Sequence, residues 1–209
     1  MFEIHYIWFR PGQILKFGLF GGTFNPIHHG HLINAQFVRE KFDLDKLFFI
    51  PSLKPVHKEL SDDVQAMHRF DMITLAIGKE SPFFEVSKCE IERRSPSYTI
   101  LTIGEFEVKF PGIKLYLIIG GDSYNEIETW KDYHEIQKRI SIIVLKRPGT
   151  ELAQKNKGDF EAGLEIIENP MIDISSSCIR KRIAEGKSIK YLVPENVEKY
   201  IKEKELYLS

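Results

Sequence analysis

Glycines and histidines gather in the segment from Gly18 to Leu32, which reads GLFGGTFNPIHHGHL. Gly21 and Gly22 would let the backbone turn sharply and approach a ligand with no Cβ atoms in the way. His28 and His31 are three residues apart, a spacing that places both imidazoles on one side of the first turn of a helix. The N-terminus of that helix would add N–H donors and a partial positive charge. Together these features predict a site for a polyphosphate.

The same residues could be ordinary turn glycines and surface histidines. That interpretation suits an isolated Gly-Gly pair or a single histidine, whereas the whole block at a strand-to-helix junction favours a ligand site. The block is not a GxGxxG fingerprint, and it is not a P-loop because no Gly-Lys-Ser/Thr follows it. A redox Rossmann protein and a P-loop ATPase are therefore disfavoured.

A second cluster of polar residues lies near the C-terminus, where Ile174 to Arg180 reads ISSSCIR. Its serines can cap a helix and supply hydroxyl and backbone donors. The planar, permanently charged fork of Arg180 suits a phosphate, and Cys178 is interpreted as a small packed residue. Taken alone, the cluster is equally compatible with a serine cap followed by a solvated basic helix.

Aromatic and polar residues in the middle of the chain could recognise a second substrate. Trp130 is suited to stacking on a pyridinium ring, which a cation–π attraction would favour. Tyr98 and Thr99 fall at the predicted N-terminus of a helix, where N–H groups favour an anionic carboxylate over a neutral amide. Each of these residues, taken singly, fits a plain structural role equally well, Trp130 in the core and Tyr98 on a helix face.

Three charged side chains extend this set. Asp122 directly follows a predicted buried strand and is placed to bond ribose hydroxyls. Lys54 and Lys58 lie in a polar loop and could meet a phosphate, although a solvated loop explains them equally well. The joint fit of all these residues to one ligand favours the functional interpretation.

Strand and helix patterns alternate through most of the chain. Apolar runs bounded by Gly or Pro predict strands over 14–20, 47–50, 83–86, 113–119 and 141–145. Helical signals predict helices over 30–42, 65–79, 97–110, 175–184 and 195–207, the last a solvated amphipathic helix. Residues 147–163 are expected to form an exposed loop. This order predicts a parallel α/β sheet with helices on both faces and ligands at the carboxyl ends of the strands.

Composition narrows the class of protein. The 209 residues include 29 Lys plus Arg and 30 Asp plus Glu, so no net charge attracts nucleic acid or an anionic membrane. Two distant cysteines in no metal or disulfide spacing indicate reduced thiols and a cytoplasmic protein. No segment has the pattern of a signal peptide or the length of a membrane span.

We expect residues 15–209 to form one domain, with a small C-terminal helical part over about 175–209. Residues 1–14 are expected to be an N-terminal extension of unknown role. The sequence leaves the oligomeric state open, a homo-oligomer included.

These motifs carry a resemblance to a known superfamily. His28-His29-Gly30-His31, after a glycine-rich first strand, resembles the HxGH signature of nucleotidyltransferases. ISSSCIR resembles their ISSTxIR element, with Ser177 where threonine is commoner. The segments PSLKPVHK (51–58), ERRSPSYT (92–99) and GGDSYNEIETW (120–130), in this order and spacing, resemble the bacterial nicotinate-nucleotide adenylyltransferases. The resemblance runs from about residue 16 to residue 200.

The resemblance implies a Rossmann-like, doubly wound parallel sheet and a reaction. AMP would pass from ATP to nicotinate mononucleotide, giving nicotinate adenine dinucleotide (deamido-NAD) and pyrophosphate in NAD biosynthesis. Mg²⁺ would be carried by the ATP phosphates, with no protein metal ligands. The acceptor is a phosphate monoester whose second pKa is about 6, so it needs no general base. The histidines are therefore expected to stabilise charge rather than to move protons.

The residues that match the family's motifs form three expected groups. The catalytic group is His28, His31, Lys58 and Arg180. The ATP-binding group is Gly21, Gly22, Thr23, Phe24, Gly30, Gly120, Asp122, Ile174, Ser175, Ser176 and Ser177. The group that binds nicotinate mononucleotide is Asn25, Lys54, Tyr98, Thr99 and Trp130.

Two other functions stay open at this point. One is the same chemistry on nicotinamide mononucleotide, alone or with dual specificity. The other is a non-catalytic module that senses a nucleotide. Such a module would keep the glycines. It would not need both histidines, and it would not need the Ser-Arg element.

Overall fold

The computed structural model describes residues 14–53, 64–78, 81–93, 95–146, 151–170 and 172–208. These residues form a single six-stranded sheet in the order β3-β2-β1-β4-β5-β6, with every neighbouring pair parallel. The strands are β1 (Lys16–Gly22), β2 (Lys46–Pro51), β3 (Phe84–Val86), β4 (Lys114–Gly120), β5 (Ser141–Leu145) and β6 (Leu164–Ile167). The predicted parallel α/β sheet is confirmed.

Side chains of the central strands enter two apolar cores, one on each face of the sheet. In β4, Ile118 packs into the first core, whereas Leu117 and Ile119 pack into the second. This alternation is the period of two that a strand imposes, and burial on both faces explains the continuous apolar run. Gly18 allows close packing in β1, because a Cβ there would lie 2.8 Å from the side chain of Leu44.

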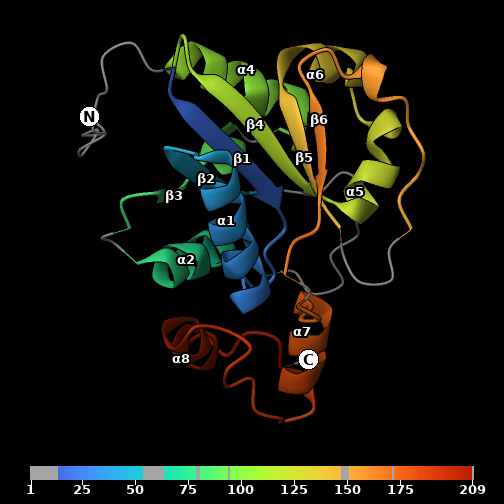
Figure 1. Cartoon of the computed structure of the whole chain (residues 1–209). Coiled ribbons are helices and arrows are strands. Elements are labelled where there is room, and N and C mark those ends of the chain that lie inside the picture. The colour runs from blue at the N-terminus through green and yellow to red at the C-terminus, as the bar shows by residue number, and fades with distance from the viewer. Residues whose placement is uncertain are drawn as a thin grey trace.

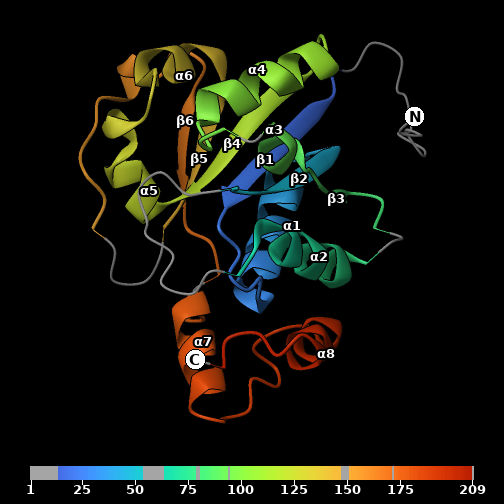
Figure 2. The same ribbon diagram turned by 180° about the vertical axis from the view of Figure 1, so that it is seen from behind.

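Helices cover both faces (Figures 1 and 2). On the first face lie α1 (His29–Phe42) and α2 (Ala66–Ile77), and on the second lie α3 (Cys89–Arg93), α4 (Thr99–Lys109) and α6 (Tyr133–Arg139). The short helices α5 (Gly121–Asn125) and η1 (Ile127–Thr129) follow β4, and η2 (Lys157–Asp159) precedes β6. None of the helices in the described ranges is long and apolar enough to cross a bilayer.

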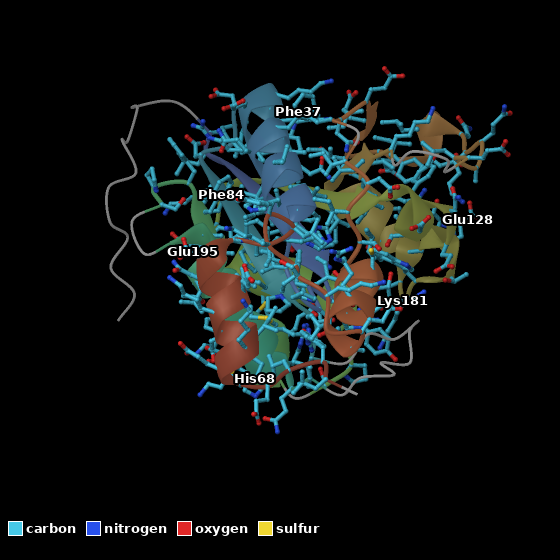
Figure 3. The ribbon with its side chains drawn as sticks, turned by 90° about the horizontal axis from the view of Figure 1, so that it is seen from below. Phe37, His68, Phe84, Glu128, Lys181 and Glu195 are labelled. Carbon is cyan, nitrogen blue, oxygen red and sulfur yellow. The ribbon has the colours of Figure 1, made fainter. Side chains whose placement is uncertain are left out.

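The last two helices, α7 (Ser176–Ala184) and α8 (Glu195–Glu203), lie at the edge of the sheet toward which β1 and β4 point (Figure 1). Seen from that edge, α7 and α8 lie side by side in front of the sheet, with His68 of α2 beside α8 (Figure 3). The side chains of Val197 and Ile201 join the first core. In addition, the Tyr200 hydroxyl donates to Asp71 at 2.9 Å and lies 2.9 Å from Nδ1 of His68.

Several sequence predictions need correction. The helix expected over 195–207 ends at Glu203. It is also not simply solvated, because Val197 and Ile201 on its apolar face are buried, as is Tyr207 after its end. The expected loop over 147–163 contains η2 and the buried Phe160, whose ring packs in the second core; residues 147–150 lie outside the described residues. Cys178 is exposed rather than packed. Strand β6 and helices α3, α5 and α6 were not predicted.

Candidate active site

The turn between β1 and α1 combines open backbone with tightly packed side chains. Gly21 is exposed, and a Cβ there would meet nothing within 4 Å. At Gly22 a Cβ would lie 2.9 Å from the ring of Phe24, so this position admits no side chain without movement. Phe24 has φ 49°, a left-handed conformation, and its ring is buried in the first core. The turn is therefore held in shape by its own aromatic residue.

His28 and His31 face each other across the first turn of α1. Their rings stack at 3.7 Å between centroids with 24° between planes, and the His28 backbone N–H donates to Nδ1 of His31 at 3.3 Å. His28 is 5% exposed, and His31 also contacts the ring of Phe24. A Cβ at Gly30 would lie 3.0 Å from the His28 ring, which explains glycine there. The predicted placement of both imidazoles on one side of the turn is confirmed.

Helix α7, from the C-terminal part of the chain, donates two hydrogen bonds to this turn. Nη1 of Arg180 donates to the Asn25 carbonyl at 2.9 Å, and Oγ of Ser176 donates to the Pro26 carbonyl at 2.8 Å. These donors are four residues apart and so lie on one helix face. Ser175 caps the helix, since its Oγ accepts from the backbone N–H of residue 178 at 3.2 Å.

The rest of the ISSSCIR segment lies around this cap. Ser177 is exposed, with its Oγ 3.2 Å from that of Ser175. Ile174 packs against the first core. The two motifs predicted to act together are thus adjacent in space.

A buried arginine ties the β1 turn to the end of β2. Arg69, on α2, is 0% exposed. Its guanidinium donates to the Thr23 carbonyl at 2.8 Å and the Ser52 carbonyl at 2.6 Å, and also to the carbonyls of Leu53 and Val64 at 3.2 and 3.4 Å. A planar fork with five donors is suited to several carbonyls at once. Arg69 therefore holds the loop after β1, the end of β2 and the segment just before α2 in one place.

The N-terminus of α4 lies on the opposite face of the sheet and starts as predicted. Tyr98 is the N-cap and Thr99 the first helical residue. Just before them, Oγ of Ser97 accepts from the backbone N–H of Leu53 at 3.0 Å. Nζ of Lys131 lies 4.8 Å from the centroid of the Tyr98 ring. These contacts bring the ERRSPSYT segment to the end of β2 and close to residue 130.

A short polar network supports the start of α4. Arg93 donates to the Thr102 hydroxyl at 2.9 Å, and that hydroxyl donates to Glu90 at 2.7 Å. Glu90 is buried, and desolvation raises its pKa, while hydrogen bonds from Ser97 and Thr102 and the charge of Arg93 act in the opposite direction. Arg93 also pairs with Glu105 at 3.4 Å. The network joins α3 to α4 beneath the expected carboxylate site.

Residues at the end of β4 complete the expected acceptor side. Gly120 is the last residue of β4 and the N-cap of α5, and Asp122 is exposed in the first turn. Trp130 is the C-cap of η1 and is half-buried, with its ring against the second core. Gly22 and Gly120 end neighbouring parallel strands, so both sets of residues lie at one edge of the sheet.

The structure thus gathers the predicted residues into two groups at the same edge. His28, His31, Arg180 and the serines come from the first face, and Tyr98, Thr99 and Trp130 from the second. Lys54 and Lys58 lie outside the described residues. Sequence reasoning missed Arg69, although a charged residue on the apolar face that also carries Met72 and Ile73 was a usable signal.

Comparisons with known proteins identify the family. Residues 19–182 match the cytidylyltransferase-like family. Two curated proteins share the name "Probable nicotinate-nucleotide adenylyltransferase". The protein from Dictyoglomus turgidum is 42% identical, and the alignment covers 92% of this chain and 96% of that protein. The protein from Thermoanaerobacter sp. is 43% identical, and the alignment covers 92% of this chain and 94% of that protein.

A solved structure shares the fold at low sequence identity. It is the Plasmodium falciparum nicotinic acid mononucleotide adenylyltransferase complexed with NaAD. It aligns with a TM-score of 0.76 at 18% identity, over 92% of this chain and 97% of its own. The fold and the site define a nucleotidyltransferase of the cytidylyltransferase-like family. Within that class, the chain belongs to the nicotinate-nucleotide adenylyltransferase family.

Proposed function

We propose that this chain transfers AMP from ATP to nicotinate mononucleotide, releasing pyrophosphate and nicotinate adenine dinucleotide. The observation that carries the proposal is the stacked pair of His28 and His31 at the N-terminus of α1, after a turn in which the Asn25 carbonyl accepts from Arg180 of α7. Cationic and N–H donors gathered at a helix N-terminus favour a polyphosphate. The names of the relatives supply the acceptor.

The reaction is an in-line displacement at phosphorus. An oxygen of the acceptor phosphate attacks the α-phosphorus of ATP and forms a new P–O bond. The bond from the α-phosphorus to the bridging oxygen of the β-phosphate breaks, and the electron pair leaves with pyrophosphate. The attacking phosphate is mostly a dianion at neutral pH, because its second pKa is about 6. No base and no covalent enzyme intermediate are needed.

The protein's task is to position the reactants and to stabilise charge on the triphosphate. We assign charge stabilisation to His28, His31 and Arg180, and also to Lys58 from its match to the family motif. The backbone at Gly21 and Gly22 is assigned to the triphosphate, since the open space at Gly21 lets it approach closely. The remaining ATP-binding assignments are Thr23, Phe24, Gly30, Gly120, Asp122, Ile174, Ser175, Ser176 and Ser177.

On the acceptor side we assign the pyridine ring to Trp130 and the carboxylate to the N-terminus of α4 at Tyr98 and Thr99. Stacking of a pyridinium on the indole is favourable, and the helix N-terminus attracts a negative charge. Asn25 and Lys54 are assigned to the rest of the mononucleotide. These contacts prefer the acid over the amide.

Mg²⁺ would accompany ATP in this proposal. The described ranges contain no group of three or more His, Cys, Asp or Glu residues that could hold a metal ion. The ion's ligands are assigned to oxygens of the ATP phosphates, because Mg²⁺ prefers such oxygens. Bound there, it would neutralise phosphate charge.

Three further statements from the sequence stay predictions: a cytoplasmic location, a single domain over 15–209, and the absence of nucleic-acid partners. The oligomeric state stays open. None of them affects the chemistry assigned to the site.

The proposal is tested by incubating the purified chain with ATP, Mg²⁺ and nicotinate mononucleotide and measuring pyrophosphate. We expect release that depends on both substrates, with nicotinate adenine dinucleotide formed in equal amount. ATP binding without any pyrophosphate release would instead identify a nucleotide-sensing module and would refute the proposal.

A further inference from the structure

The C-terminal end of the chain returns to the turn after β1. Tyr207 is 5% exposed, and its hydroxyl donates to Oδ1 of Asn25 at 2.5 Å, across 182 residues of sequence. Asn25 itself is 3% exposed. A buried hydrogen bond between groups so far apart in sequence ties the C-terminus directly to the side chain of an expected acceptor-binding residue.

The backbone around Tyr207 is shaped to make this contact. Tyr207 has φ 65° and Glu205 has φ 51°, a left-handed conformation that is unusual for residues with bulky side chains. The backbone N–H of Leu206 donates to the carbonyl of Ile201 at 3.0 Å and turns the chain back at the end of α8. Such conformations persist where the surroundings over-determine them, and they cluster at functional sites. Burial of the Tyr207 ring in the first core supplies that constraint.

The direction of the hydrogen bond fixes the orientation of the Asn25 carboxamide. A phenol has one hydrogen, and here it is donated to Oδ1. The carboxamide therefore keeps its oxygen toward Tyr207 and its two Nδ2 hydrogens on the other side. The backbone of Asn25 is held at the same time, because its carbonyl accepts from Arg180. The backbone carbonyl and the side chain of Asn25 are thus both held by hydrogen bonds from residues of the C-terminal part.

We propose that Tyr207 is a positioning residue for the acceptor substrate. By holding Oδ1 of Asn25, it aims the Nδ2 donors at nicotinate mononucleotide. This inference rests on the proposed function and adds a role for the chain's last residues. Without the hydroxyl, the carboxamide can rotate and present either atom, so the acceptor binds less well while ATP binding is unchanged.

The test is the Tyr207→Phe variant, which removes one oxygen and keeps the ring. We expect KM for nicotinate mononucleotide to rise about tenfold, which corresponds to about 1.4 kcal/mol. KM for ATP should stay within about twofold. Asn25→Ala should give a similar rise, and the double variant should be no worse than Asn25→Ala, because the two residues act as one unit.

Tyr200→Phe is the matched control, since it removes a hydroxyl from the same helical part. Its bonds are to His68 and Asp71 on α2, away from Asn25. A purely structural role for Tyr207 would make both variants lower the melting temperature and leave both KM values alone.

Equal effects of Tyr207→Phe on both substrates, or unchanged kinetics, would overturn the inference. So would a double variant whose effects simply add. A failure of this inference can be told apart from a failure of the proposed function. The proposed function fails only if the wild-type chain itself releases no pyrophosphate.

Discussion

The two sides of the proposed site are built differently. On the phosphate side, His28 is 5% exposed, and the turn before it is bonded to α2 and α7, elements distant in the chain. On the acceptor side, Asp122 is exposed and Trp130 half-buried. There, Thr102 of α4 is bonded to Arg93 and Glu90 of α3, a near neighbour in sequence. If the proposed assignments hold, charge stabilisation is organised before ATP binds, whereas acceptor selectivity rests on a more open surface.

The largest effect should follow from loss of a phosphate-side imidazole. We expect His31→Ala to lower kcat by about 10²–10³, the usual cost of one charge-stabilising donor. KM for either substrate should change little, because the donor acts mainly in the transition state. Steady-state kinetics of pyrophosphate release measures this.

The matched control for this prediction is His29→Ala, in the same HxGH segment but outside the stacked pair. Its backbone N–H, which donates to the Leu192 carbonyl at 3.0 Å, is kept. A kcat for His31→Ala near that of His29→Ala would contradict a preorganised phosphate side.

The next effect tests how that side is held together. Arg69→Lys keeps a positive charge but loses the fork, so some of the four bonded carbonyls lose their donor. We expect kcat to fall about tenfold to a hundredfold through misplacement of the turn. The melting temperature should also fall, by about 2–4 °C for each kcal/mol lost.

Arg139→Met is a suitable comparison, because it removes an arginine that pairs with Glu107 between α6 and α4. It should leave kcat unchanged well below its melting temperature. If Arg69→Lys behaved in the same way, Arg69 would serve stability alone.

Much of this architecture could be predicted from the sequence. Buried parallel strands have near-continuous apolar runs, so β4 and β5 were found within a residue or two. The HxGH and ISSSCIR segments were found because glycines, imidazoles and serines occur in a specific spacing. The short strand β6 escaped because its ends are buried and its middle exposed, which leaves no clear period.

The supports of the site were not predictable in the same way. The apolar face of α2 signals that Arg69 is buried, but its partners are backbone carbonyls, which carry no residue signature. Tyr207 reaches Asn25 because Glu205 and Tyr207 have left-handed backbone conformations, and neither is a glycine or asparagine that would have predicted a turn there. Contacts of this kind depend on the tertiary arrangement, which a single sequence does not display.

A smaller effect should appear on the acceptor side. Trp130→Ala should raise KM for nicotinate mononucleotide about tenfold, since a cation–π contact contributes about 0.5–2 kcal/mol. KM for ATP serves as the internal reference and should not move. Trp130→Phe should recover part of the loss because it keeps an aromatic face. A parallel rise in both KM values would mean that Trp130 is only a core residue.

The smallest effect concerns pH and the C-terminal part. Burial and the hydrogen bond to Asp71 raise the pKa of Tyr200 from 10.0 to about 12. The unfolded chain therefore loses this proton first, so the stabilisation is complete below about pH 10 and is lost as pH rises through about 12. In Tyr200→Phe, the free energy of unfolding should fall less steeply between these pH values. Denaturant titrations at several pH values would show it, and identical slopes would argue against the Tyr200–Asp71 bond.

The most direct test of the central claim compares kcat/KM for nicotinate and nicotinamide mononucleotide with the same enzyme and ATP. The α4 N-terminus should favour the carboxylate, and hydrogen bonds to a charged group contribute about 1.5–3 kcal/mol. We therefore predict a preference for the acid of about 10- to 100-fold. Equal use of the two mononucleotides, or a preference for the amide, would contradict the assignment.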